Sequence, residues 1–565
     1  MSKKDRPWHA SYPSDVPTQV DCHPFENLTD LFDYAVRKYA HRKAYMNMNE
    51  SLTYEELSND VEHFASFLQH YWHMKKGDKL AIMLPNLMQY PIVVFGALKA
   101  GLSVVNVNPL YTPRELQTIL VDSGATAIVV ISNYAFNLQS IIAKTQIKYV
   151  LVTNVGDAFG FIKGHIVNFV VRFIKKMVPS YGFGDIVTFK HALHIGSLKE
   201  PEPVFVKYND IAFLQYTGGT TGKPKGAMLS HGNLISNIAQ AYGMYGPVLR
   251  QGEETIVTAI PLYHVFALTI NCLLFTYIGA TNILITDPRD TRSFIKDLAR
   301  NADRISCITG VNTLFNLLIN NKEFTSLKFS QLRLVVGGGA QVQSGVAQRF
   351  YDLTGHHILE GYGLTECSPL VAVCPYTTDH YTGSIGLPIP STDVRIVDAD
   401  GNDIWEINKS GELLIKGPQV MQGYYNNQSA TDNVMDNGYV RTGDIAVWLE
   451  GGYIRIIDRI KDMILVSGFN VFPSEIEDVV SKNPKVLECA AIGIASETTG
   501  EAVRLVVVRK DPKLTAQEII DYCREYLTPY KIPHSIIFTD TLPKSAIGKV
   551  LRRKLRENFA NARTN

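Results

Sequence analysis

Residues 216–229 read YTGGTTGKPKGAML, a run of glycine, threonine and lysine that ends in an apolar stretch. Glycine lets backbone N–H groups turn inward and threonine adds hydroxyl donors, so this loop suits an anion such as phosphate. It does not match the Walker A pattern, G-x-x-x-x-G-K-[ST]. Three residues separate Gly218 from Gly222, and Lys223 is followed by Pro224 instead of a hydroxyl residue. The loop therefore predicts a different anion site, which we expect to lead into the helix start SHGNLISN.

The bulk composition excludes several classes of protein. The 565 residues include 55 Lys+Arg and 54 Asp+Glu, a formal net charge of +1, so no nucleic acid partner is expected. The seven cysteines are scattered without a CxxC pair, which favours reduced thiols over zinc or disulfides. The first residues lack an apolar signal region, and no run of 18 apolar residues occurs. These features predict a cytoplasmic protein.

Short β-branched runs alternate with helical segments along the first two thirds of the chain. The runs lie at residues 79–86, 103–109, 127–132, 149–153, 211–217, 255–262, 333–339 and 357–363. This rhythm predicts an α/β fold in which helices cover mostly parallel sheets. The later strands end at polar or glycine-rich turns, and carboxyl ends of parallel strands share one edge. We therefore expect these turns to form one ligand site.

The pattern changes near Thr382, where shorter strands with Gly, Asp and Asn turns predict a small β-rich subdomain. A compact α/β tail follows Arg459, with a helix from Pro473, two strands and a second helix. We expect a large N-terminal domain at residues 1–458 and a small C-terminal domain at residues 459–565.

Four further stretches place reactive side chains at turns. GYGLTEC (361–367) puts Glu366 after a strand and a glycine turn, where it suits Mg²⁺. GGGA (337–340) permits close backbone approach to a flat ring or a phosphate. GYVRTGDI (438–445) offers Asp444 to ribose hydroxyls. LPKSAIGKVLRRKL (542–555) places Lys549 near a basic helix. Each stretch alone is equally typical of a solvated turn.

In order along the chain, these motifs resemble the set that characterises the adenylate-forming enzymes, the acyl-CoA synthetase and luciferase superfamily. The set comprises YTGGTTGKPKGAML, PLYH (261–264), GYGLTE, YVRTGD, IDRIKDMILVSGFNVFPSEIE (456–477) and PKSAIGK. NVNPLYTPREL (106–116) and EGYGLTECSPLV (360–371) look most like the bacterial long-chain fatty-acid–CoA ligases. The resemblance implies ATP-dependent conversion of a long-chain fatty acid to acyl-AMP and pyrophosphate, then transfer to coenzyme A with release of AMP. Mg²⁺ is the implied cofactor.

The resemblance also implies roles for individual residues. The leaving phosphates of ATP would contact Thr217, Gly218, Gly219, Thr220, Thr221, Gly222, Lys223, Lys225 and Gly226. Adenine and the α-phosphate would contact Gly338, Gly339, Ala340, Gly361, Tyr362, Gly363, Leu364 and Thr365. Asp444 and Arg459 would bind the ribose. The expected catalytic residues are Lys549, Glu366, His264 and Thr217, with Thr217 and Glu366 holding Mg²⁺. Lys461 matches the hinge of a mobile C-terminal domain, and the Gly468 loop would face coenzyme A.

Alternatives stay open at this point. A fatty-acyl-AMP ligase that serves a carrier protein, or a non-catalytic binder of fatty acid and nucleotide, would share most motifs. The stretch from Pro261 to Gly279 has no Asp or Glu, which fits an apolar acyl tunnel and fits a buried helix equally well. A homodimer is also left open.

Residues 160–181 form a basic amphipathic pattern. Ile162, Ile166, Phe169, Val170, Phe173 and Met177 share one helical face, opposite His165, Asn168, Arg172, Lys175 and Lys176. The pattern is typical of a peripheral contact, here with the cytoplasmic face of the inner membrane, and equally of a helix packed on the protein core.

Overall fold

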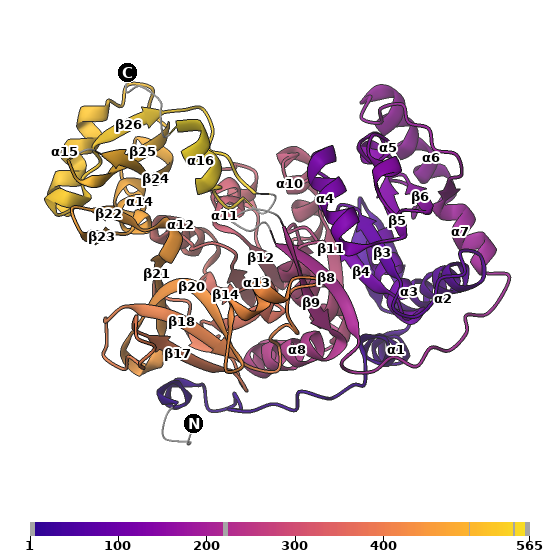
Figure 1. Ribbon diagram of the computed structural model, residues 1–565. Coiled ribbons are helices and arrows are strands. Elements are labelled where there is room, and N and C mark those ends of the chain that lie inside the picture. Colours follow the sequence, from indigo (N-terminus) through magenta and orange to yellow (C-terminus); the bar gives the residue numbers. More distant parts are fainter. Residues whose placement is uncertain (1–5, 218–223, 497, 546–547, 560–565) are drawn as a thin grey trace.

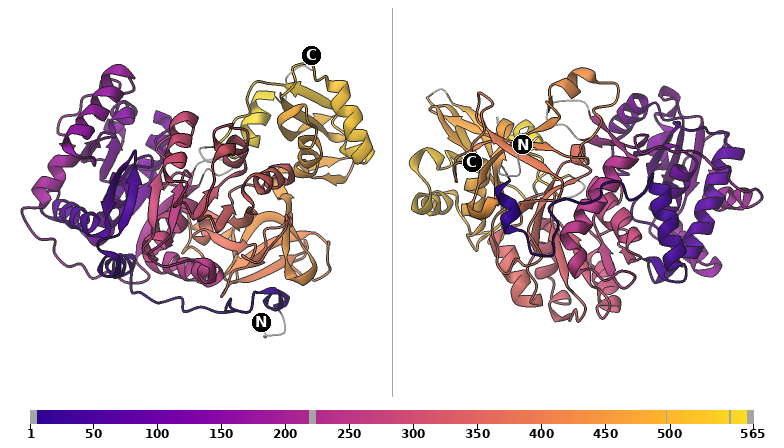
Figure 2. Two further views of the ribbon diagram at one scale, coloured as in Figure 1. Left: turned by 180° about the vertical axis from the view of Figure 1, so that it is seen from behind. Right: turned by 90° about the horizontal axis from the view of Figure 1, so that it is seen from below.

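The computed structural model describes residues 6–217, 224–496, 498–545 and 548–559. Two large, mostly parallel sheets with helices on their faces form the larger part of the molecule, and two smaller sheets follow along the chain (Figure 1). The C-terminal part lies at one end of the molecule, and the segments near residue 100 lie at the other (Figure 2). The predicted α/β class is confirmed.

The first large sheet has seven strands in the order β7-β6-β5-β3-β4-β8-β9. Their bounds are β3 Lys79–Met83, β4 Ser103–Asn106, β5 Ala127–Ile131, β6 Tyr149–Thr153, β7 Val187–Thr188, β8 Ile211–Thr217 and β9 Lys225–Ser230. All neighbours are parallel except β8 and β9. Alternate residues of β3 enter different hydrophobic clusters on the two faces, Leu80 and Ile82 on one and Ala81 and Met83 on the other. Burial on both faces explains why these strands read as continuous apolar runs.

The second large sheet has nine strands in the order β16-β15-β14-β13-β12-β10-β11-β1-β2. Their bounds are β1 Lys43–Asn47, β2 Glu50–Thr53, β10 Thr255–Thr258, β11 Thr281–Leu284, β12 Cys307–Gly310, β13 Leu334–Gly337, β14 Leu359–Gly363, β15 Leu370–Val373 and β16 Leu387–Pro388. Its central strands are parallel, whereas β2, β15 and β16 add antiparallel edges.

Helices cover both sheets. Their bounds are α1 Leu28–Tyr39, α2 Tyr54–His70, α3 Gln89–Lys99, α4 Pro113–Ser123, α5 Ala135–Gln139, α6 Phe161–Phe169, α7 Phe189–Gly196, α8 His231–Tyr245, α9 Phe275–Tyr277, α10 Thr291–Asn301, α11 Asn312–Ile319, α12 Ser344–Thr354 and α13 Gln428–Asp432. Two π-helical segments extend this set, η5 Val170–Ile174 after α6 and η7 Ala267–Leu274 before α9. Within the described ranges, no helix has the length and hydrophobicity that a membrane span requires.

The helix start predicted at SHGNLISN is confirmed, whereas a strand that the sequence did not predict, β9, separates it from the glycine-rich loop. β9 follows the loop and runs antiparallel to β8, with Thr217 paired to Lys225. The helix α8 begins only at His231, where the Ser230 side chain caps it by accepting a hydrogen bond from the Asn233 backbone N–H. The apolar residues after the loop extend the sheet because Ala227 and Leu229 are buried against the core.

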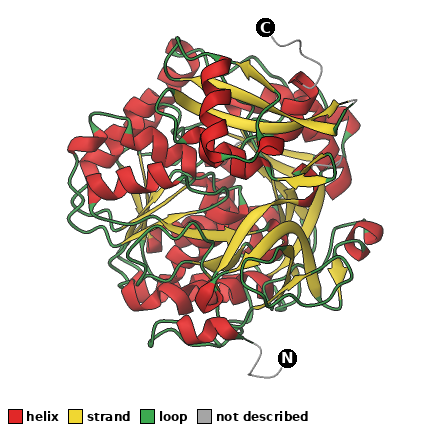
Figure 3. Ribbon diagram, turned by 90° about the vertical axis from the view of Figure 1, so that its left-hand side faces the viewer, coloured by secondary structure: helices red, strands yellow, loops and turns green. Residues whose placement is uncertain are grey.

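The last third of the chain builds two smaller sheets. The β-rich sheet contains β17 Asp393–Val397, β18 Gly411–Lys416, β19 Met435–Asp436, β20 Tyr439–Trp448 and β21 Ile454–Arg459. The C-terminal sheet contains β22 Ile464–Val466, β23 Phe469–Val471, β24 Val486–Ser496, β25 Gly500–Arg509 and β26 Ser535–Phe538. Its helices are α14 Pro473–Ser481, α15 Ala516–Tyr526 and α16 Arg552–Phe559 (Figures 1 and 3).

An N-terminal segment joins distant parts of the chain. It runs along the underside of the molecule in Figure 1 and ends in a short helical turn, η2 Pro7–Ser11. Trp8 is fully buried there in the core of the β-rich sheet, stacked on Trp448 with ring centroids 5.7 Å apart. Trp405 stacks on Trp448 at the same separation but is 43% exposed.

This difference in burial generates a prediction. Trp8→Ala should lower the free energy of unfolding by about 3–5 kcal/mol, because a large aromatic side chain leaves a packed core. Trp405→Ala removes an equivalent ring contact from an exposed position and should cost much less. Urea titrations followed by circular dichroism measure both variants. Equal losses would show that burial of Trp8 adds nothing to the stacking contact.

Candidate functional site

One cavity of about 1770 Å³ opens where β8, β13 and β14 end. Its wall includes most of the residues singled out in the sequence, although they come from distant segments. These are Thr217, Lys225, His264, Gly338, Gly339, Gly361, Tyr362, Gly363, Leu364, Thr365, Glu366, Arg459, Lys461 and Lys549. The shared edge of the strands thus gathers the motifs, with Lys549 contributed by the C-terminal part.

The rest of the predicted residues either fall outside the described residues or are described and do not line the wall. Residues 218–223, which include Gly218, Gly219, Thr220, Thr221, Gly222 and Lys223, lie outside the described residues. Among the described ones, Gly226 packs against the Tyr216 ring, Ala340 is exposed and Asp444 is buried behind the wall. Gly468 is exposed near the turn between β22 and β23. Of the predicted residues that the structure describes, these four do not line the cavity.

Gly363 has a structural reason to be glycine. A Cβ atom there would lie 2.3 Å from the Pro369 carbonyl oxygen, which is closer than real contacts allow. Any larger side chain would therefore push β14 away from the segment that leads into β15. Packing against Pro369 therefore explains why one residue of the turn before Glu366 is glycine.

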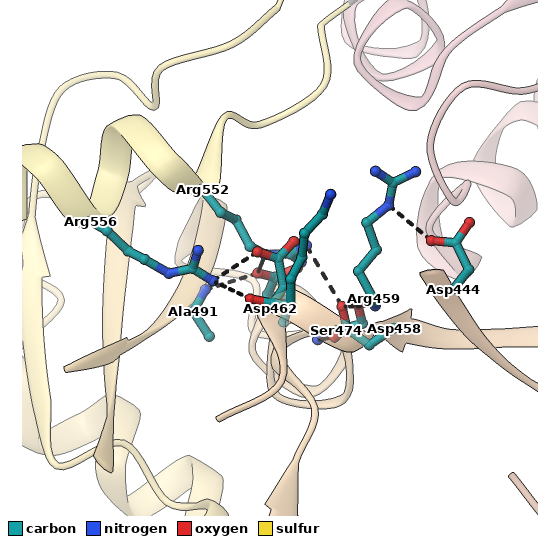
Figure 4. A network of polar contacts seen from close by, with 10 residues as sticks. Asp444, Asp458, Arg459, Asp462, Ser474, Ala491, Arg552 and Arg556 are labelled. Carbon is teal, nitrogen blue, oxygen red and sulfur yellow. Dashed lines mark hydrogen bonds and ion pairs between the residues drawn. The ribbon is translucent and has the colours of Figure 1, made fainter. Parts of the chain in front are cut away.

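The Asp444 carboxylate is held by two neighbours. The Tyr362 hydroxyl donates a hydrogen bond to Asp444 Oδ2 at 2.5 Å, and Arg459 Nε lies 2.9 Å from Oδ1 (Figure 4 shows the Arg459 pair). The antiparallel pairing of β20 and β21 places Asp444 directly opposite Arg459. Burial, together with the charge of Asp444, raises the pKa of Tyr362 well above its ordinary value, so the phenol stays protonated and keeps donating.

His264 and Lys549 face the same part of the cavity. Burial lowers the pKa of His264 to about 4, and the positive charge of Lys549 contributes in the same direction. His264 is therefore neutral at pH 7. Burial and the nearby Arg459 charge lower the pKa of Lys549 to about 8, whereas Asp444 acts against them. Lys549 thus remains mostly protonated near neutral pH while its charge is poorly solvated.

Glu366 has a partner that sequence reasoning missed. The Tyr424 hydroxyl donates to Glu366 Oε1 at 2.6 Å, and Lys225 Nζ lies 5.0 Å from the centre of the Tyr424 ring. Tyr424 therefore orients the carboxylate and connects it to the end of the glycine-rich loop. It follows a glycine in an ordinary Gly-Tyr-Tyr stretch, so only its position in the fold reveals the contact.

The donor set fits Mg²⁺ that arrives on phosphate oxygens. Within the described part of the chain, no group of three or more His, Cys, Asp or Glu side chains could hold a metal by itself. Mg²⁺ often uses one or two carboxylates together with substrate phosphates and water. Glu366 and the Thr217 hydroxyl line the same cavity and match this requirement.

An apolar tunnel extends the cavity between η7, α8 and the nine-stranded sheet. Its lining includes Ala241, Tyr245, Ile270, Leu274, Leu334 and Val336. Leu334 begins β13, whereas Gly338 follows the opposite end of the strand beside Gly361. Four residues of strand span about 13 Å at roughly 3.3 Å per residue. The tunnel therefore extends from the polar site, at the carboxyl ends of the strands, toward their amino-terminal ends.

Asp458 ties the β-rich sheet to the C-terminal part. Its backbone pairs with Ile445 in β20, yet its Oδ2 atom accepts a hydrogen bond at 2.9 Å from the Ser474 N–H in the first turn of α14. Arg552 of α16 places Nη1 3.8 Å from Asp458 Oδ1, and its guanidinium also pairs with Asp462 through Nη1 and with Glu477 through Nη2 (Figure 4). The same carboxylate thus caps one helix and faces a second.

Known proteins with similar sequences agree with this assignment of the motifs to one site. The profile of the AMP-binding enzyme family matches residues 32–425, and that of the AMP-binding enzyme C-terminal domain matches residues 475–549. The chain belongs to the AMP-binding enzyme family. The resemblance drawn from the motifs is confirmed.

Its relatives include enzymes and a solved structure. This AMP-binding enzyme is 53% identical to a long-chain-fatty-acid–CoA ligase of Escherichia coli O6:H1 over 97% of this chain and 98% of the relative. It is 32% identical to the enzyme of that name from Bacillus subtilis, over 98% of both chains. ATP-bound MatB from Rhodopseudomonas palustris aligns with a TM-score of 0.80 and 25% identity, over 95% of this chain and 99% of the other.

The Asp458 contacts lead to a test of how this AMP-binding enzyme holds its C-terminal part. Asp458→Ala removes a helix cap, which is typically worth about 1 kcal/mol, and a charge that faces Arg552. Trypsin should cut the connection around Lys461 about fivefold faster, or more. The reason is that the C-terminal part spends more time detached from the β-rich sheet, which exposes the connection to the protease. Asp478→Ala, which removes an exposed pair with Lys482, is the matched control. Equal cleavage rates in the two variants would rule out a holding role for Asp458.

Proposed function

We propose that this AMP-binding enzyme is a long-chain fatty-acid–CoA ligase of the AMP-forming type. It activates the fatty acid with ATP to acyl-AMP and pyrophosphate, then transfers the acyl group to coenzyme A and releases AMP. The observation that carries the proposal is the continuous cavity that has Lys549, His264 and Glu366 at one end and an apolar tunnel at the other. Relatives named long-chain-fatty-acid–CoA ligase, 50–53% identical over nearly the whole chain, support the substrate class.

Charge neutralisation is the main task of the first step. The fatty-acid carboxylate attacks the α-phosphate, and pyrophosphate departs, so negative charge gathers on both sides of the reacting phosphorus. Lys549 bridges the carboxylate and the α-phosphate as a compact point charge. His264 is neutral at pH 7 and therefore adds a dipole beside the carboxylate without competing as an ion.

The remaining residues position the nucleotide. The glycine-rich loop binds the departing phosphates, while Gly338 and the stretch Gly361–Thr365 flank adenine and the α-phosphate. Asp444, oriented by Tyr362 and Arg459, accepts hydrogen bonds from the ribose hydroxyls. Glu366 and Thr217 would hold Mg²⁺ when ATP is bound, and the metal would neutralise charge on the phosphates.

The two parts of the chain have different tasks in this proposal. Residues 1–458 bind ATP and the acyl group, and residues 459–565 deliver Lys549. Rotation about Lys461 then withdraws Lys549 and brings the Gly468 loop toward coenzyme A. The exposed position of Gly468 outside the cavity wall supports this, because a residue that acts only in the second step has no need to line the first site. We also propose a cytoplasmic location with peripheral membrane contact.

Half-reaction assays on the protein and on Lys549→Ala test the proposal. Pyrophosphate release should require a long-chain acid, and thioester should appear only with coenzyme A. Lys549→Ala should slow adenylation by about 10²–10³, the usual effect of losing one preorganised donor, yet spare thioester formation from supplied acyl-AMP. Lys531→Ala, which removes an ion pair with Glu475 elsewhere in the C-terminal part, controls for folding.

These assays separate the alternatives. Acyl-AMP that accumulates in the presence of coenzyme A would indicate an acyl-AMP ligase that serves a carrier protein. Ligand binding without pyrophosphate release would indicate a non-catalytic binder. If Lys549→Ala slowed both half-reactions equally, alternation of the C-terminal part would lose its support.

The apolar tunnel predicts which residue limits the length of the acyl chain. Leu334→Phe should fill the end farthest from Lys549 and shift the preference toward shorter acids, while the rate with short acids stays within about twofold. Kinetics across saturated acids of increasing length measure this. Val335→Ile changes the adjacent residue, which does not line the cavity, and should leave the preference unaltered. An unchanged profile in Leu334→Phe would place the end of the acyl chain elsewhere.

A further inference from the structure

Residues 161–177, the basic apolar helix, present an unusual surface. The segment comprises α6, the π-helical η5 and the three non-helical residues 175–177 that follow, and lies at the end of the molecule opposite α15 (Figure 1). Large hydrophobic side chains along it are more exposed than covered, with Phe161 at 78% and Ile162 at 74%. The others are Ile166, Phe169, Phe173, Ile174 and Met177. Exposed hydrophobic residues gathered in this way mark an interaction site.

The basic apolar helix is attached to the protein by its small and polar residues. The Asn168 side chain accepts a hydrogen bond from the Gly156 N–H at 2.8 Å and donates one to Asp157 Oδ1 at 2.9 Å. Gly164 is buried so close to Gly156 that a Cβ atom there would lie 2.5 Å from the Gly156 carbonyl oxygen. Of the two interpretations of this sequence pattern, packing of the entire apolar face on the core is therefore wrong, because Ile162, Phe169 and Phe173 are 74%, 56% and 62% exposed.

Its charges identify the kind of surface that would cover it. Residues 158–184 contain four basic residues, Lys163, Arg172, Lys175 and Lys176, and no Asp or Glu. Lys163 pairs with Glu50 at 3.0 Å, whereas the other three take part in no ion pair among the residues that the structure describes. Exposed Phe and Ile side chains interleaved with Lys and Arg match the interface of an anionic bilayer, where apolar groups enter the acyl boundary and cations meet headgroups.

The inner side of the same helix reaches the proposed active site. Residues of this segment that line the large cavity, next to Val155 and Met48, are Ile166, Val167, Val170, Val171, Lys175 and Met177. Phe169 and Phe173, whose ring centroids lie 5.2 Å apart, are not part of its lining and face outward. One segment thus has an outer face suited to lipid and an inner face on the route to Lys549.

We propose that the basic apolar helix rests in the interface of an anionic bilayer and forms the rim across which a fatty acid passes from the bilayer into the cavity. The inference rests on the proposed function, since it concerns how the acid reaches that site. A long-chain acid is far more concentrated in a bilayer than in water, because each buried methylene favours the apolar phase. Contact at this rim spares the acid a passage through water.

Flotation of the full chain with vesicles tests the binding surface. The protein should float with phosphatidylcholine–phosphatidylglycerol vesicles, much less with phosphatidylcholine alone, and less at high salt. Phe169→Asp plus Phe173→Asp should weaken binding by about tenfold or more, because two anchoring rings become charged. Tyr526→Asp plus Leu487→Asp, two exposed hydrophobic residues of the C-terminal part, should bind like the unaltered protein. Arg172→Glu plus Lys176→Glu should lose binding with all apolar residues kept.

Acyl-CoA formation tests the route. With oleate embedded in the anionic vesicles, the Phe169/Phe173 variant should be about tenfold slower, whereas with oleate in detergent micelles it should match the unaltered protein. Unaltered vesicle binding in that variant, or equal binding to both vesicle types, would overturn the proposal. An equal loss of rate with vesicles and micelles would overturn it too. If the unaltered protein made no acyl-CoA from micellar oleate, the proposed function itself would fail, whatever the vesicles showed.

Discussion

The buried carboxylate of Asp444 is the constraint around which the site is arranged. Removal of a charged group from water is costly unless it gains a counter-charge and hydrogen bonds. Asp444 gains both, from Arg459 and from Tyr362, which belongs to the nine-stranded sheet. This requirement fixes the β-rich sheet against the edge of the large sheet. It also sets the position of Arg459, the last residue of β21, immediately before the connection to the C-terminal part. The ion pair of Asp444 and Arg459 therefore joins the β-rich sheet to the cavity wall, since Arg459 and Tyr362 both line the cavity.

The sequence predicted the elements whose signals are local. Local signals set the bounds of helix α4, because Pro113 sits at its first position, Thr112 and Glu115 form a capping box, and Gly124 ends it with φ +65°. The parallel strands were predicted for a similar reason, since burial on both faces demands continuous apolar runs. β9 was missed because its identity as a strand depends on pairing with β8 across a glycine-rich loop. No pattern within the six residues of β9 distinguishes that strand from the lead into a helix.

The residues of the candidate site were predicted from motifs, so residues that belong to no motif were not predicted. Glu366, His264 and Lys549 belong to recognisable stretches, and the structure brings all three to one cavity. Tyr424 belongs to no such stretch, although its hydroxyl fixes the Glu366 carboxylate. The orientation of the basic apolar helix likewise could not be predicted from the periodicity of its sequence alone. Periodicity gives the two faces of a helix, whereas the contact of Gly164 with Gly156 decides which face turns inward.

The position of Trp8 has a consequence for synthesis of the chain. Trp8 and its stacking partner Trp448 are 440 residues apart in sequence. At about 5–20 residues per second on a ribosome, that separation corresponds to roughly 20 seconds to a minute and a half. The segment made first therefore reaches its place only after the strands of both large sheets have been synthesised. Throughout that interval the Trp8 indole, which is fully buried in the folded protein, stays without its stacking partner.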